Sequence, residues 1–298
     1  MRKLVVILLV VLIAGSVFGD VKIGISGAVE WDTLQIKAAV SLDLASAGIR
    51  LPSGRTQGEA LLSSEYLRLM QPGILDLQVD SSSTIADLII RGEFSLLEAD
   101  ALTLMAQSVP PALSSDLKNI SASYTMPLSG LSSALLRHNR PSPIMRTLSP
   151  VSTAQYTGII IIAAENLPVH GRRSSALPIP CLFPKIWDSD MNLVYERNML
   201  EMQYTAAQNT AMVRYAPPES IFQNNPSGLT PELAAIVGDR PLRIFARGVF
   251  GIKPTDPIID RNDALLIISS EENRRLLSQG KVVIILDDSV LRYEFTGD

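Results

Sequence analysis

Residues 156–164 read YTGIIIIAA, the most informative stretch of the chain for its fold class. Four successive isoleucines, Ile159–Ile162, are typical of a β-strand that is covered on both faces. Residues 264–268 and 281–286 (ALLII and KVVIIL) are further apolar runs that predict strands. Between them, Ser269 or Ser270 is expected to cap a helix that ends at Gly280. A crossover of that length can join parallel neighbours, so the second half predicts a mixed sheet with helices packed on it.

The first half shows alternation instead of continuous apolar runs. Residues 35–44 and 120–128 each place apolar side chains on every second position, which predicts half-buried strands. Two helices are expected between these strands, over 54–71 and 93–107, with Pro72-Gly73 and Val109-Pro110-Pro111 ending them. Their expected core faces are Leu62, Tyr66, Leu69 and Met70 in the first helix, and Leu97, Ala101, Leu104 and Met105 in the second.

Proline and serine divide the chain near its middle. Pro141-Ser142-Pro143 and Ser149-Pro150 border a stretch without periodicity, so residues 139–152 are interpreted as a linker. We therefore predict an α+β fold with two mixed-sheet domains: an N-terminal α+β domain over 20–138 and a C-terminal mixed α/β domain over 153–298. Helices pack on the sheets in both.

Residues 1–19 have the layout of a secretory signal peptide. Arg2 and Lys3 precede an apolar run, and small residues lead to an expected cleavage after Gly19. An uncleaved membrane anchor is the alternative, but a spanning helix needs about 20 apolar residues and this run is interrupted at Gly15-Ser16. No later segment is long and apolar enough to span a bilayer. The mature chain is thus expected in the periplasm or at the outer membrane.

Charge and cysteine content narrow the class of protein. The full chain carries a net charge of −4, and loss of the two leader cations makes it more negative. An acidic surface argues against a nucleic-acid partner, which requires clustered Lys and Arg. Cys181 is the single cysteine, so no intrachain disulfide can form, and we interpret it as a buried apolar side chain.

Candidate chemistry is sparse. Residues 188–192 (DSDMN) match the start of a calcium loop, but Leu193 and Met199 stand where the turn glycine and bidentate acid belong, so we favour a hairpin turn. His138 and His170 are the only histidines, and neither lies in a nucleophile or zinc motif. No catalytic residue, cofactor-binding residue or metal ligand is predicted, and no cofactor is expected.

A proline-rich loop over 168–184 contains the segment His170-Gly171-Arg172-Arg173. Proline rigidity lowers the cost of ordering such a loop on binding. His170, Arg172 and Arg173 are therefore the candidate partner-binding residues, against the alternative that two adjacent arginines are simply solvated surface.

The order of elements in the second half resembles flagellar assembly protein T and flagellar P-protein type envelope proteins. The resemblance rests on residues 156–164, 182–188 (LFPKIWD), 193–196 (LVYE), 246–248 (ARG), Asp260, Asp263-Ala264 and 281–286. Spirochaete envelope proteins without assigned roles are similar too. These families imply exported α/β modules associated with rings around the flagellar motor, and they bring no catalytic residues.

These observations favour a non-catalytic structural or assembly protein of the cell envelope, associated with the flagellum. It would act through contacts with envelope proteins or through self-association. Two alternatives remain open. One is an exported hydrolase in which a serine, an aspartate and His138 or His170 converge. The other is a periplasmic protein that binds a small ligand in a cleft between the two halves.

Overall fold

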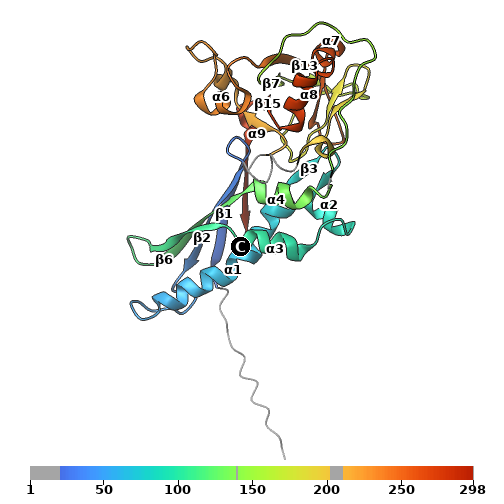
Figure 1. Ribbon diagram of the computed structural model, residues 1–298. Coiled ribbons are helices and arrows are strands. Elements are labelled where there is room, and N and C mark those ends of the chain that lie inside the picture. Colours follow the sequence, from blue (N-terminus) through green and yellow to red (C-terminus); the bar gives the residue numbers. More distant parts are fainter. Residues whose placement is uncertain (1–20, 139, 202–210, 298) are drawn as a thin grey trace, which may run out of the picture.

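A computed structural model describes residues 21–138, 140–201 and 211–297. Two domains lie one above the other, joined at a narrow waist (Figure 1). Both contain helices and a sheet, which confirms the predicted α+β class with two domains. The second sheet is mixed as predicted, whereas the first is antiparallel. The expected leader, residues 1–19, lies outside the described residues.

The first domain is built on a five-stranded antiparallel sheet in the order β16-β1-β2-β6-β5. In β2, Ile36, Ala38, Val40 and Leu42 are buried, whereas the alternate residues Lys37, Ala39 and Ser41 are exposed, so the period-two prediction is confirmed. The strands are β1 (Ile23–Glu30), β2 (Gln35–Asp43), β5 (Gln107–Leu113), β6 (Asn119–Pro127) and β16 (Arg292–Gly297).

Helix α1 (Arg55–Leu75) packs on one face of this sheet through the predicted face. The side chains of Leu62, Tyr66, Leu69 and Met70 are all at most 4% exposed. The predicted stop at Pro72 is wrong, because the helix continues past this residue and buries Gly73 and Ile74. Smaller elements complete the domain: β3 (Gln78–Asp80), β4 (Ser83–Thr84), α2 (Ile85–Ile90), α3 (Leu96–Leu104) and α4 (Leu128–Leu135).

The second domain has a seven-stranded mixed sheet in the order β11-β10-β14-β13-β7-β15-β12. Strand β7 (Ile159–Ile162) lies between two parallel neighbours, β13 (Leu242–Phe250) and β15 (Val282–Ile285). Ile160 and Ile161 are 0% exposed and belong to different apolar clusters, so the strand is covered on both faces as predicted. The other strands are β10 (Ile186–Asp188), β11 (Leu193–Tyr195), β12 (Arg214–Ala216) and β14 (Asp256–Ile259).

Helices cover both faces of this second sheet. Leu233 and Val237 of α6 (Pro231–Val237) belong to the same apolar cluster as Ile160, and α7 (Arg261–Ile268) and α8 (Glu271–Ser278) belong to the main core on the other face. The predicted strand over 264–268 is wrong: these residues form α7, which Asp260 caps. A short apolar run fits a buried helix as well as a strand, and periodicity does not separate them. The remaining elements are β8 (Leu167–Pro168), β9 (Ser175–Ala176), η1 (Arg197–Met199), η2 (Pro218–Ile221) and α9 (Asp288–Leu291).

The helices differ in length and polarity. Helix α1 spans 21 residues and carries arginine and glutamate side chains along its length. In the part of the chain that the structure describes, no helix combines the length and the apolar character needed to cross a bilayer.

The last strand does not stay in the second domain. After α9 the chain returns to the first domain, where β16 pairs with β1 at one edge of the sheet (Figure 1). Phe295 of β16 lies where Gly27 of β1 and Gly73 of α1 leave space for its ring; a Cβ at Gly73 would lie only 2.6 Å from it. The expected C-terminal domain over 153–298 therefore gives its final strand to the other sheet.

The two domains share one continuous apolar core. At their junction, Leu182 N and Phe183 N donate to the carbonyls of Gln78 and Val79, at 3.0 and 2.8 Å. The Trp31 and Tyr215 rings meet edge to face with centroids 6.0 Å apart. The described part of the predicted linker, 140–152, is irregular and also contacts the second domain, since Ser142 N donates to Asn198 O at 2.6 Å.

Candidate partner-binding surfaces

Helix α3 presents an apolar stripe to solvent. Ser95 caps the helix: its hydroxyl accepts from Glu98 N, and the Glu98 carboxylate accepts from Ser95 N. From this start, Leu97 and Leu104 are 80% and 65% exposed, while Ala99 and Thr103 on the opposite side are buried. The predicted helix over 93–107 is shorter in the structure, where α3 spans Leu96–Leu104. Its large apolar side chains face solvent, so the prediction that they pack into the core is wrong.

The α3 stripe, defined as Leu97, Ala101, Leu104 and Met105, follows the helical spacing of one face. Met105 is 76% exposed. Ile90 and Val109, which precede and follow α3 in the chain, are 82% and 60% exposed. Scattered exposed apolar residues are ordinary, but apolar residues at successive helical turns form a patch of the kind that marks protein contacts.

Acidic side chains border the α3 stripe on both sides. Glu98 and Asp100 lie at helical positions flanking Leu97 and Ala101. Hydrogen bonds from the Ser95 backbone and hydroxyl lower the pKa of Glu98, so this carboxylate is charged at neutral pH. Gln71 Nε2 donates to Asp100 Oδ1 at 3.3 Å. Arg137 Nη2 lies 3.6 Å from Glu98 Oε2, so one side of the stripe carries an ion pair and the other side, at Asp100, is anionic.

The sequence-predicted partner loop forms a tight hairpin turn between β8 and β9. His170, Arg172 and Arg173 are all exposed, and Gly171 has a φ of +77° that suits the turn. His170 N donates to Val249 O at 2.8 Å, and the His170 ring lies 6.0 Å from the ring of Phe250. The loop is docked on the end of β13, and its role in binding stays a prediction.

A pocket of about 460 Å³ opens at the junction of the two domains. Trp31 and Leu77 of the first domain, Ile179 and Pro180 of the second, and Tyr293 of β16 form its apolar walls, with Lys253 at its border. Sequence reasoning missed this pocket, because the segments that line it are distant in the chain and carry no shared pattern.

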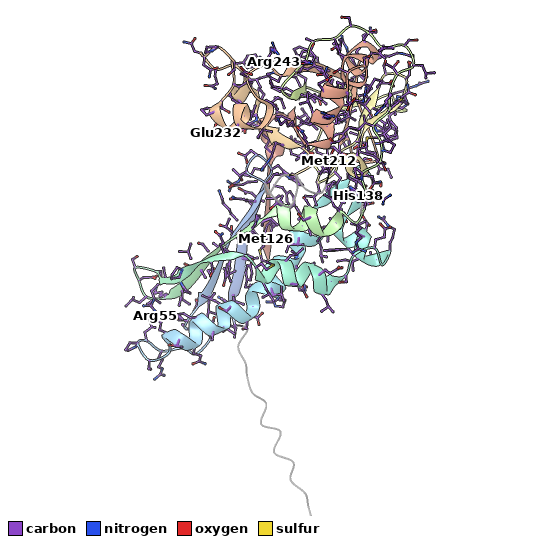
Figure 2. All side chains as sticks on the ribbon, viewed as in Figure 1. Arg55, Met126, His138, Met212, Glu232 and Arg243 are labelled. Atoms are coloured by element: carbon purple, nitrogen blue, oxygen red, sulfur yellow. The ribbon has the colours of Figure 1, made fainter. Side chains whose placement is uncertain are left out.

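The histidines are not brought together with acids. His138 Nε2 lies 2.8 Å from the carbonyl of Leu200, at the waist between the domains (Figure 2), and no hydrogen bond joins its ring to a carboxylate among the described residues. His170 is exposed on the hairpin turn. The pairing required by the hydrolase alternative is therefore not present among the described contacts.

The turn at 188–192 confirms the hairpin interpretation. Asp188 Oδ1 accepts hydrogen bonds from the backbone N–H groups of Asp190 and Asn192, at 3.0 and 2.7 Å, and β10 pairs with β11 on either side. Within residues 21–138, 140–201 and 211–297, no three His, Cys, Asp or Glu side chains are grouped as metal ligands would be.

Two buried polar groups lie beneath the junction. Cys181 is 0% exposed, as predicted, and burial raises the pKa of its thiol. Asp256 is also 0% exposed; its Oδ1 accepts from Lys185 N and Thr255 Oγ1, whereas its Oδ2 has no hydrogen-bond partner among the described residues. Burial raises the pKa of Asp256. Sequence reasoning missed this residue, because nothing in Thr255-Asp256-Pro257 indicates burial.

Comparison with known proteins finds two family models, one matching each domain of the chain. Residues 22–134 match the family model of the N-terminal domain of Treponema pallidum Tp0624, and residues 158–288 match the model of its second domain. Both domains match Tp0624 family models. The flagellar families named above are not among the matches, whereas the likeness to spirochaete proteins is supported. No curated protein matches the chain. Strand β16 lies beyond the range matched to the second Tp0624 domain, yet it completes the sheet of the first.

Proposed function

We propose that this protein is a non-catalytic structural or assembly component of the bacterial cell envelope that acts through protein–protein contacts. The observation that carries the proposal is the α3 stripe. Its apolar side chains face solvent although the same helix has a buried face, and an exposed apolar ridge is stabilised when a partner covers it. The Tp0624 matches add no catalytic role.

The chemistry of the α3 stripe describes its partner. Leu97, Leu104 and Met105 fit an apolar groove, since a helix docks into a groove through side chains at successive turns. Asp100 on the border favours a basic residue on that side of the groove, whereas Glu98 is already paired with Arg137. The partner is therefore a protein with an apolar groove and a cationic side chain on its rim.

Cross-linking in intact cells tests this proposal. The double variant Leu97→Ser/Leu104→Ser is expected to reduce the recovered envelope partner at least tenfold. The matched control is Leu117→Ser/Leu148→Ser, which makes the same change at exposed leucines outside the stripe (59% and 102% exposed). Equal recovery with both double variants would remove the stripe from the interaction, and absence of any partner with the unaltered chain would contradict the proposed function.

Export belongs to the same proposal. The charged start, apolar run and small residues of 1–19 support secretion into the periplasm, with or without association with the outer membrane. Cell fractionation with N-terminal sequencing is expected to recover a chain that begins at Asp20. An intact chain dissolved in the cytosol would overturn this part. A flagellar setting rests on the sequence resemblance alone, and deletion of the gene followed by imaging of the flagellar motor would test it.

The interdomain pocket favours a second candidate function, the binding of a small molecule. Its size and apolar walls are within the range of ligand sites at domain interfaces. A ligand bound there would contact both domains and raise the melting temperature. A thermal-shift screen of the unaltered chain and of Tyr293→Ala is the test, and a hit that shifts both equally would place the ligand elsewhere.

A further inference from the structure

Strand β16 occupies an edge of the first sheet, and its outer edge is unpaired among the described residues. Trp31 N donates to Leu291 O at 2.9 Å, so these two residues form a hydrogen-bonded pair at the start of the antiparallel ladder between β1 and β16. Hydrogen-bonded pairs alternate along such a ladder. The backbone groups of Tyr293 and Phe295 therefore point toward β1, and those of Arg292, Glu294 and Thr296 point away from the sheet.

Three successive outward positions form a free pairing edge. β16 contains no proline, so each of these residues offers both an N–H and a C=O to another strand. The opposite edge of the sheet is different: β5 contains Pro110 and Pro111, and its pairing with β6 is irregular. Proline cannot donate to a ladder. Of the two edge strands of this sheet, β16 is therefore the one whose backbone can form a regular ladder with another strand.

The side chains of β16 determine which strand suits this edge. Arg292 and Glu294 lie on the solvent face, where Arg292 Nε approaches Glu294 Oε1 at 3.1 Å and Arg292 Nη1 lies 3.5 Å from Glu30 Oε1. Tyr293 lies on the opposite face and is 47% exposed. We propose that β16 pairs with β16 of a second copy of this chain, antiparallel, about a two-fold axis at Tyr293.

The charges of Arg292 and Glu294 favour a two-fold axis at Tyr293 over an axis at either neighbouring residue. An axis at Arg292 would place Arg292 opposite the same residue of the other copy, and an axis at Glu294 would place two glutamates opposite each other. Like charges opposed across a ladder are destabilising. An axis at Tyr293 places Arg292 of each copy opposite Glu294 of the other, which gives two attractive pairs.

The same axis makes the two Tyr293 residues a non-hydrogen-bonded pair, in which side chains approach most closely. Aromatic pairs at such positions stabilise sheets. Tyr293 also lines the interdomain pocket. The ladder covers residues 292–294 of each copy, because Thr296 would face Val290, which lies in α9. It gives a closed, self-complementary contact between the two five-stranded sheets.

This inference deepens the proposed function, on which it rests in part, by naming the edge through which copies associate. It is separable from the α3 stripe: a monomeric chain would remove the β16 contact and leave the envelope partner of α3 in place, and loss of that partner would leave the dimer in place.

Charge reversal with mixing tests the register. Sedimentation of the purified protein at micromolar concentration is expected to show a dimer. Arg292→Glu and Glu294→Arg are each expected to weaken the dimer at least tenfold, because like charges then face each other. An equimolar mixture of the two variants is expected to restore a heterodimer, in which two acidic side chains at positions 292 and 294 of one chain face two arginines at the same positions of the other.

Arg55→Glu is the matched control, since it reverses a similarly exposed arginine that is also ion-paired, on α1 (53% against 59% exposed). A monomeric wild-type protein, dimers that neither reversal affects, or a mixture that stays monomeric would each overturn the proposal. A monomeric wild-type chain that binds an extended peptide of another protein at this edge would likewise overturn the homodimer.

A cysteine at the axis provides a readout that does not depend on charge. Cα atoms of a non-hydrogen-bonded pair lie about 4.5 Å apart, within the span of a disulfide. Tyr293→Cys is therefore expected to form an intermolecular disulfide on mild oxidation, and Cys181 does not compete because it is buried. Thr296→Cys is the control, because this register places the two copies of residue 296 far apart along the ladder and no disulfide forms. Equal cross-linking of both variants would overturn the register.

Discussion

Single residues control how the first domain is closed. Phe295 is 7% exposed and fills the space above Gly27 and Gly73, two positions where any side chain would collide with its ring. The glycines are in β1 and α1, whereas the phenylalanine is in the last strand of the chain. The contact links the N-terminal sheet to the end of the polypeptide through one aromatic side chain.

Phe295→Ala is expected to lower the free energy of unfolding by about 3–5 kcal/mol, because it leaves a cavity between β1 and α1. Urea denaturation measures the change. Phe222→Ala removes the same atoms from a ring that is 75% exposed, and should cost less than about 0.5 kcal/mol. Similar losses from both variants would contradict the role of Phe295 in closing the domain.

Asp256 gives the chain a specific pH dependence. Burial raises its pKa above the ordinary 3.8, so the folded state holds this proton more tightly than the unfolded state. The contribution of protonated Asp256 to the free energy of unfolding is fully present below the pKa that this carboxyl has in the unfolded chain. The contribution is lost as the pH rises through the higher pKa of Asp256 in the folded chain.

Asp256→Asn is expected to remove this loss, because the amide oxygen still accepts from Lys185 N and Thr255 Oγ1 and carries no charge. Above a pH of about 4, the stability of the wild type should fall relative to the variant by at most about 1.4 kcal/mol per pH unit, until the folded pKa is passed. Denaturation curves at several pH values measure this difference. Parallel stability profiles would show that Asp256 is not protonated in the fold.

At the scale of elements, α1 and α3 have the same apolar pattern and opposite orientations. Both place Leu, Tyr, Ala or Met at positions i, i+4, i+7 and i+8. In α1 this face lies on the sheet, whereas in α3 the small residues Ala99 and Thr103 are buried and the large ones face solvent. A helix packs closely on its neighbours through small side chains, so the local pattern predicts a helix but not which side is covered.

Matched substitutions should separate the two helices. Leu62→Ala in α1 is expected to cost about 2–5 kcal/mol, since Leu62 is fully buried. Leu97→Ala in α3 should change stability by less than about 0.5 kcal/mol. Both values come from the same urea titration. A large loss from Leu97→Ala would mean that its face is covered within the chain, and would also weaken the proposed partner surface.

At the scale of the whole molecule, the two domains are held together by more than the linker. β16 carries the chain back into the first sheet, one apolar core spans both domains, and backbone hydrogen bonds join β3 to residues 182–183. Trp31, at the turn between β1 and β2, meets Tyr215 of β12 at this junction. Such a junction couples the unfolding of the two domains.

The unaltered chain is therefore expected to unfold in one cooperative transition. Trp31→Ala should separate the transitions of the two domains, since it removes a side chain that is only 4% exposed at their junction. Hydrogen exchange read separately in residues 22–134 and 158–288 measures this effect. Trp187→Ala, a change within the second domain, is the control and should leave the first domain unaffected. Two transitions in the wild type would contradict the coupling.

The features that the amino-acid sequence alone predicted depend on interactions between residues that are close in the chain. Alternation in residues 35–44, the four isoleucines at 159–162, the buried face of α1 and the side-chain-capped turn at Asp188 follow from local periodicity and local hydrogen bonds. Long-range packing, in contrast, was needed to show that α3 faces solvent, that residues 264–268 are helical, that Asp256 is buried and that the final strand belongs to the first sheet. Each of these depends on which distant segment lies against a residue, and contact between distant segments leaves no period in the sequence.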